Sequence, residues 1–170
     1  MKRYLLIIIV IICCIISLTG CKTKKKESSK DLSLEKGKIT VVCKSGNLGD
    51  AVIKMKSTVT SNFDKNKNIM NYKVETIEEN KDKKSYESRK KMYEDSYKQL
   101  KNTKDNVYDM IVDDSKKKIT LITVIKNIDI NTYGEEERKT YEIATYIKNY
   151  ESGAYKCSIT GITRKELGLK

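Results

Sequence analysis

The chain has no histidine, no proline and no tryptophan, and it has one phenylalanine among its 170 residues. Histidine is the commonest general base and the commonest nitrogen ligand for metals. Its absence therefore excludes Ser-His-Asp and Cys-His catalysis and every metal centre that depends on imidazole. With so few large aromatics, aliphatic residues and eleven tyrosines must fill the core. The length suits one domain preceded by a leader.

Motifs that carry chemistry are also lacking. Residues 46–50, "GNLGD", have neither the lysine nor the spacing of a phosphate-binding loop. The Ser-x-x-Lys pattern of serine acyl-enzymes occurs three times, a number that chance alone explains in a chain with 31 lysines. The other sequence motifs of these enzymes are missing. Asp113 and Asp114 are adjacent, so they suit a turn better than a shared metal site. We expect no catalytic residue, no metal site and no cofactor.

The first 21 residues have the layout of a bacterial lipoprotein signal peptide. Lys2 and Arg3 precede an apolar run, Leu5 to Ile16, which is shorter than the roughly 20 residues of a membrane-spanning helix. The ending Leu18-Thr19-Gly20-Cys21 resembles a lipobox, with a thiol that takes diacylglycerol and small residues just before it. This predicts removal of residues 1–20 and a lipid on Cys21. The alternatives are an ordinary secretory leader and a short uncleaved anchor.

Lysine dominates the charge of the chain. The net charge is +12, and loss of the two basic residues of the leader would leave 33 basic and 23 acidic residues, or +10. This sign favours an anionic partner, although AT-rich codon usage also raises the lysine content. Residues 21–37 resemble a flexible tether that spans roughly 20–25 Å. Its lysines either attract anionic headgroups or form a solvated spacer; they are Lys22, Lys24, Lys25 and Lys26.

Residues 38–170 are predicted to form a single α+β domain. The expected strands are 38–45, 53–63, 70–74, 107–112, 118–128 and 154–160, and the expected helices are 85–104 and 135–152. Ser85 is placed to cap the first helix. The order β-β-β-α-β-β-α-β predicts an antiparallel sheet of about five to six strands packed with two helices.

One face of the predicted sheet carries lysines. Apolar and polar residues alternate along 53–63, which is typical of a half-buried strand. Lys54 and Lys56 lie on its polar side, and Lys73 lies on the following strand. These three lysines could form a basic patch for an anionic glycopolymer or lipid. A merely solvated face is the alternative.

Two cysteines remain once Cys21 carries a lipid. Cys43 and Cys157 lie in short β-rich stretches at the two ends of the domain. An exported domain reaches a compartment where disulfides persist. We therefore expect neighbouring strands and a Cys43–Cys157 bond, with α-carbons about 4.4–6.8 Å apart. Two separately buried, reduced thiols are the alternative.

The layout as a whole resembles a known family. The chain resembles the YehR-like lipoproteins in its lipobox, its early strand with "VVC", its alternating strand pairs and helices, and its late "YKC". These are small bacterial envelope proteins of unknown function. The resemblance covers most of the mature chain and depends on Cys43 and on Tyr155-Lys156-Cys157. It implies an envelope location and no particular reaction.

These features predict a noncatalytic protein held by its lipid on the extracytoplasmic face of the cell membrane. It would bind a protein partner or ligand of unknown specificity. The alternative is electrostatic association with anionic cell-wall polymer or lipid, and an enzyme is a distant third. Nucleic acid is not expected, because the protein is exported and has no aromatic-basic RNA-binding motif. An apolar concavity would favour a ligand binder, and a flat lysine face would favour the electrostatic role.

Overall fold

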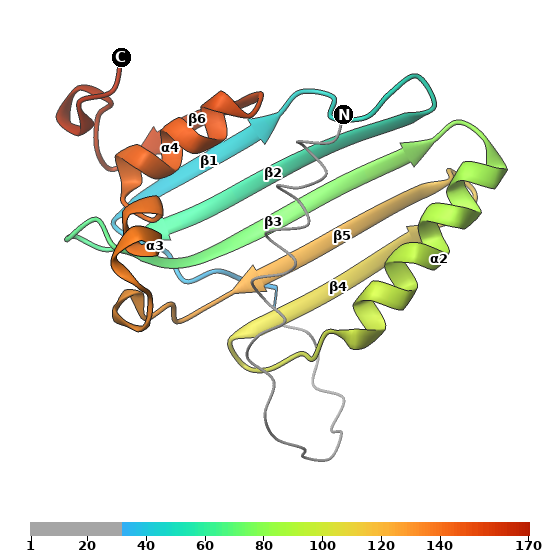
Figure 1. Cartoon of the computed structure of the whole chain (residues 1–170), viewed down its shortest axis with the longest axis horizontal. Helices are drawn as coiled ribbons and strands as arrows, with labels where there is room; N and C mark the ends of the chain where they lie inside the picture. The colour runs from blue at the N-terminus through green and yellow to red at the C-terminus, as the bar shows by residue number, and fades with distance from the viewer. Residues whose placement is uncertain (1–31) are drawn as a thin grey trace.

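The computed structural model describes residues 32–170, which form an α+β fold around a six-stranded antiparallel sheet (Figure 1). The strands are β1 (Ile39–Ser45), β2 (Ile53–Phe63), β3 (Ile69–Asn80), β4 (Asn106–Asp113), β5 (Lys118–Ile125) and β6 (Tyr155–Thr160). The helices are α2 (Lys83–Gln99), α3 (Glu135–Thr140) and α4 (Ile143–Ser152), with short 3-10 turns η2 (Ile130–Thr132) and η3 (Lys165–Leu167). The predicted fold class and element order are confirmed. The leader and residues 21–31 of the expected tether lie outside the described residues.

The strand order across the sheet is β4-β5-β3-β2-β1-β6. Strands β1, β2 and β3 form a meander, because each pairs with the next along the chain. The hairpin of β4 and β5 joins it through β5, and β6 returns to the opposite edge beside β1. The first strand of the fold is therefore interior, and the last strand forms an edge.

Helices α2 and α4 lie on the same side of the sheet, near opposite edges (Figure 1). Arg89 of α2 contacts Glu78 of β3, and Tyr146 of α4 is hydrogen-bonded to Ser61 of β2. Ser61 is paired with Tyr72, and side chains alternate along a strand, so Ser61 and Glu78 project from one face. We name this side the helix face and the other side the open face.

The main hydrophobic core lies on the helix face, between α4 and strands β1 and β2. It is formed by Val41, Cys43, Val59 and Phe63 of the sheet together with Ile143, Tyr146 and Ile147 of α4. A smaller cluster lies on the open face, where Leu32 and Leu34 pack against Val107, Ile122 and Val124. The segment 32–37 has no helix or strand, but it lies along the sheet rather than apart from it.

Two details of the helices differ from the prediction. The sequence predicts one helix over 135–152, whereas the chain breaks into α3 and α4 at Glu142, whose backbone is extended. No residue of α3 is buried, so no packing holds it in line with α4, and the break lets Ile143 enter the core. Helix α2 is capped by Asp82 rather than Ser85, because the Asp82 carboxylate accepts a hydrogen bond from the Ser85 amide.

A carboxylate is fully buried beneath α2. Glu78 is 0 % exposed, and its oxygens accept hydrogen bonds from Arg89, Tyr93 and Asn80. Burial alone would raise the pKa of Glu78, but the hydrogen bonds from Arg89 and Asn80 hold this pKa below its ordinary value of 4.5. The stability that the ionised group contributes is present above that ordinary pKa and is lost as the pH falls through the lower, folded-state pKa.

Replacing Arg89 with Met should lower the free energy of unfolding by about 2–4 kcal/mol, because Glu78 would stay buried without its cation. The matched control is Arg138→Met on α3, where the side chain is exposed and the expected change is below about 0.5 kcal/mol. Urea denaturation at pH 7 measures both. Equal losses in the two variants would show that the ion pair does not hold α2 on the sheet.

Candidate functional site

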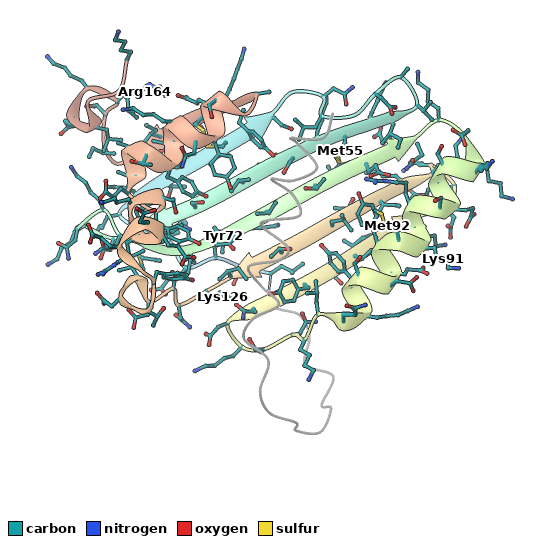
Figure 2. The ribbon with its side chains drawn as sticks, viewed as in Figure 1. Met55, Tyr72, Lys91, Met92, Lys126 and Arg164 are labelled. Carbon is teal, nitrogen blue, oxygen red and sulfur yellow. A yellow bond between two sulfur atoms is a disulfide. The ribbon has the colours of Figure 1, made fainter. Side chains whose placement is uncertain are left out.

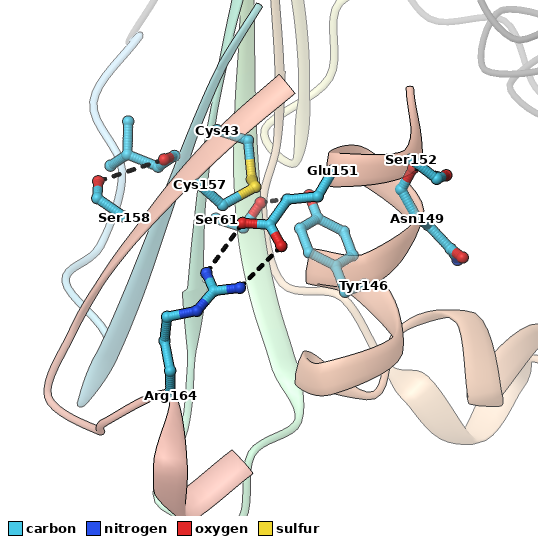
Figure 3. The surroundings of a disulfide bond; sticks show 10 residues. Cys43, Ser61, Tyr146, Asn149, Glu151, Ser152, Cys157, Ser158 and Arg164 are labelled. Atoms are coloured by element: carbon cyan, nitrogen blue, oxygen red, sulfur yellow. Dashed lines mark hydrogen bonds and ion pairs between the residues drawn. A yellow bond between two sulfur atoms is a disulfide. The ribbon is translucent and has the colours of Figure 1, made fainter. Parts of the chain in front are cut away.

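The predicted disulfide is confirmed. Cys43 and Cys157 are bonded, with an S–S distance of 2.01 Å (Figure 3). They lie directly opposite each other on the neighbouring antiparallel strands β1 and β6. Their α-carbons are 4.0 Å apart, which is closer than expected, because directly paired residues of adjacent strands are among the closest pairs in a sheet. The bond spans 114 residues of sequence, and on the chain-entropy model it contributes about 4–5 kcal/mol.

The same pairing sets two lysines against each other. In the β1–β6 ladder the rung next to Cys43–Cys157 joins Lys44 to Lys156, and both lysines are exposed. Cys43 faces the core beneath α4, so the alternation of side chains places Lys44 and Lys156 on the open face. Like charges directly opposite each other on a sheet destabilise it by about 0.2–1 kcal/mol. The fold therefore maintains an unfavourable contact beside its disulfide.

Strand β2 adds two more lysines to this surface. Lys44 is paired with Thr58, and alternation from Thr58 places Lys56 and Lys54 on the open face as well. All four lysines are exposed. We name them the lysine patch: Lys44, Lys54, Lys56 and Lys156. From the ordinary dimensions of a sheet, the patch extends roughly 10 Å across the strands and roughly 13 Å along them.

Charge divides the open face into two halves. Strands β6, β1 and β2 carry the four lysines of the patch and no acidic residue. The other half carries carboxylates on the same face, which are Glu75, Glu79, Asp109 and Asp113. Lys73, which the sequence grouped with Lys54 and Lys56, shares their face but lies 3.2 Å from the Glu75 carboxylate. Lys73 is thus paired, whereas no lysine of the patch makes an ion pair within residues 32–170, although Lys54 at the border of the patch lies opposite Glu79 on β3.

Hydroxyl groups accompany the lysines. Thr58 and Thr60 on β2 and Thr160 on β6 project from the open face by the same alternation. A hydroxyl can donate a hydrogen bond to an anionic oxygen, and lysine supplies the charge. This half of the open face therefore offers both cations and neutral hydrogen-bond donors on the surface of the sheet.

A cavity among the described residues lies elsewhere, at the junction of α3 and α4. It has a volume of about 600 Å³, and its charged lining residues are Lys67, Arg138, Glu142 and Glu166. The charges balance, and Glu166 is already engaged, because hydrogen bonds from Thr163 lower the pKa of its carboxyl. No residue that the sequence singled out as a site lies in this cavity. It is not the apolar concavity that a ligand binder of the expected kind requires.

The adjacent carboxylates Asp113 and Asp114 are both engaged in hydrogen bonds. Asp113 accepts hydrogen bonds from Ser115 and Lys116, and Asp114 accepts them from Lys90 and Tyr86. The bond from Ser115 lowers the pKa of Asp113, and the bond from Lys90 lowers the pKa of Asp114. These contacts close the β4–β5 turn and attach it to α2. Across residues 32–170, no three Cys, Asp or Glu side chains gather as metal ligands.

Some predicted site residues are not described, and two members of the patch were missed. The expected lipid site Cys21 and the tether lysines lie outside the described residues; the latter are Lys22, Lys24, Lys25 and Lys26. The sequence reading did not single out Lys44 and Lys156 as a pair. The signal was present, because an in-register antiparallel Cys43–Cys157 pair places residue 44 opposite residue 156.

Comparisons of the chain with protein-family models, with curated proteins and with solved structures give no match. The resemblance to YehR-like lipoproteins therefore stays a prediction. Within residues 32–170, no helix combines the length and the apolar character needed to cross a membrane.

Replacing Lys156 with Thr should raise the free energy of unfolding by about 0.2–1 kcal/mol at low salt, because the contact with Lys44 is removed. The gain should shrink in 1 M NaCl, where the Debye length is about 3 Å. Urea denaturation at both salt concentrations measures it. The control is Lys118→Thr on β5, since Lys118 lies opposite Glu79 and Asp113 and should give no gain. A Lys156→Thr variant that loses stability at low salt would contradict the repulsion.

Proposed function

We propose that this protein is a noncatalytic, lipid-anchored envelope protein whose lysine patch binds closely spaced negative charges. The observation that carries the proposal is the pairing of Lys44 with Lys156 beside Lys54 and Lys56, on three strands without an acidic residue. An external polyanion would relieve the repulsion within this group. The site and its ligand are thus complementary in charge.

The shape of the surface supports an electrostatic role rather than a fitted pocket. The patch lies on a sheet face that no described helix covers, and the charge-balanced cavity near α3 lies away from it. Four cations within roughly 10 by 13 Å suit a row of phosphates on a polymer or a lipid surface better than one small anion. Such binding weakens steeply as the salt concentration rises.

The noncatalytic part of the proposal rests on the side chains that are available. The chain has no histidine, and the ionised Glu78 is saturated by hydrogen bonds from three side chains. Asp113 and Asp114 are likewise engaged in the β4–β5 turn. These carboxylates are committed to structure, so none is free to act as a general base.

Neutralising the lysine patch should weaken binding to soluble polyphosphate by roughly 100-fold or more in 50 mM NaCl, at about 1 kcal/mol for each lysine. The variant replaces all four patch lysines with Gln. The matched control makes the same change at four exposed lysines of α2, which are Lys83, Lys84, Lys91 and Lys98. Titration of the full-length protein in detergent measures both affinities. Equal losses would show that net charge, rather than the patch, determines binding.

The lipid anchor has its own test. Changing Cys21 to Ser removes the thiol that takes diacylglycerol, so we expect an uncleaved precursor that incorporates no labelled fatty acid. Cell fractionation and a mass measurement follow the product. Normal processing together with normal lipid labelling of the variant would contradict the lipoprotein assignment.

A further inference from the structure

The chain enters the fold across the open face. Leu32 and Leu34 pack on three residues that project from that face, which are Val107, Ile122 and Val124. The Glu35 carbonyl then accepts a hydrogen bond of 3.0 Å from the side-chain amide of Asn71, another open-face residue. At Gly37 an added Cβ would lie 2.5 Å from the Phe63 carbonyl oxygen, so the absence of a side chain lets this segment lie against β2.

This path brings the proposed lipid close to the open face. Leu32 is eleven positions after Cys21, a distance of at most about 36–40 Å along a fully extended chain. The last segment before the sheet therefore lies on the same face as the lysine patch, over β4 and β5, while α2 and α4 lie on the other face (Figure 1).

We propose that the half of the open face that carries the lysine patch lies against the anionic membrane in which the Cys21 lipid is inserted, with the patch lysines on the phospholipid phosphates and the carboxylates of β3 and β4 farther from the membrane. The inference rests on the proposed function and adds the partner and the orientation. The helix face then points away from the membrane. The face on which the chain enters and the charge of the patch support this orientation.

Tryptophan fluorescence tests the orientation, because the chain contains no tryptophan and one introduced residue reports its own position. Thr60→Trp places the reporter on the open face of β2, and Lys91→Trp places it on the exposed side of α2 (Figure 2). Thr160→Trp, exposed on β6, is a second open-face reporter if Thr60→Trp folds poorly. Full-length lipidated protein is reconstituted into phosphatidylcholine vesicles with one quarter phosphatidylglycerol and a trace of dansyl-labelled headgroup.

We expect energy transfer to dansyl to be at least twofold more efficient from Thr60→Trp than from Lys91→Trp. This difference should vanish when the four patch lysines are replaced with Gln and when phosphatidylglycerol is omitted. Equal transfer from the two positions, or greater transfer from Lys91→Trp, would overturn the orientation. If polyphosphate still binds through the patch in that case, the proposed function stands and the membrane is not its partner. If the patch variant binds polyphosphate normally, the proposed function fails as well.

Discussion

The pairing of β1 with β6, secured by the Cys43–Cys157 bond, is the constraint on which the rest of this structure depends. It joins the first strand to the last across 114 residues, a long-range contact that is costly in chain entropy without a covalent link. The pairing also positions α4, which precedes β6 in the chain and packs over the core residues of β1 and β2. A slip of one residue would turn every side chain of β6 over, so Lys156 would enter the core and Cys157 would face solvent.

Much of this arrangement could be predicted from local patterns. Alternation along 53–63 correctly placed Lys54 and Lys56 on the outward face of the strand. The presence of two thiols in β-rich segments correctly indicated a disulfide between them. The neutralisation of Lys73 was also readable, because Glu75 is two residues further along the same strand. The order of the strands across the sheet could not be predicted, since no local signal indicates that β5 pairs with β3. The break at Glu142 could not be predicted for a similar reason, because it depends on which residues of α4 pack into the core.

A simpler role for part of the patch is protection of an edge strand. Lysine on an edge discourages pairing with a second molecule, and Lys156 lies on the edge strand β6. This explanation does not extend to Lys44, Lys54 and Lys56, because β1 and β2 are interior strands. An antiparallel sheet can leave one face in water with any polar residue there, so solvation alone does not require lysine on these strands. The concentration of one charge across three strands therefore needs a reason outside the fold.

The estimated binding energy of the patch places the docked and undocked states of the domain close to equal population. Four lysines at about 1 kcal/mol each give roughly 4 kcal/mol, which corresponds to a dissociation constant near 1 mM. Attachment of a lipid eleven positions before Leu32 would supply an effective concentration that is also in the millimolar range. The lipid would keep the domain at the membrane, and the patch would determine which face it presents. Because the dissociation constant and the effective concentration are similar, modest changes in anionic lipid content or ionic strength would shift the domain between a docked and an undocked orientation.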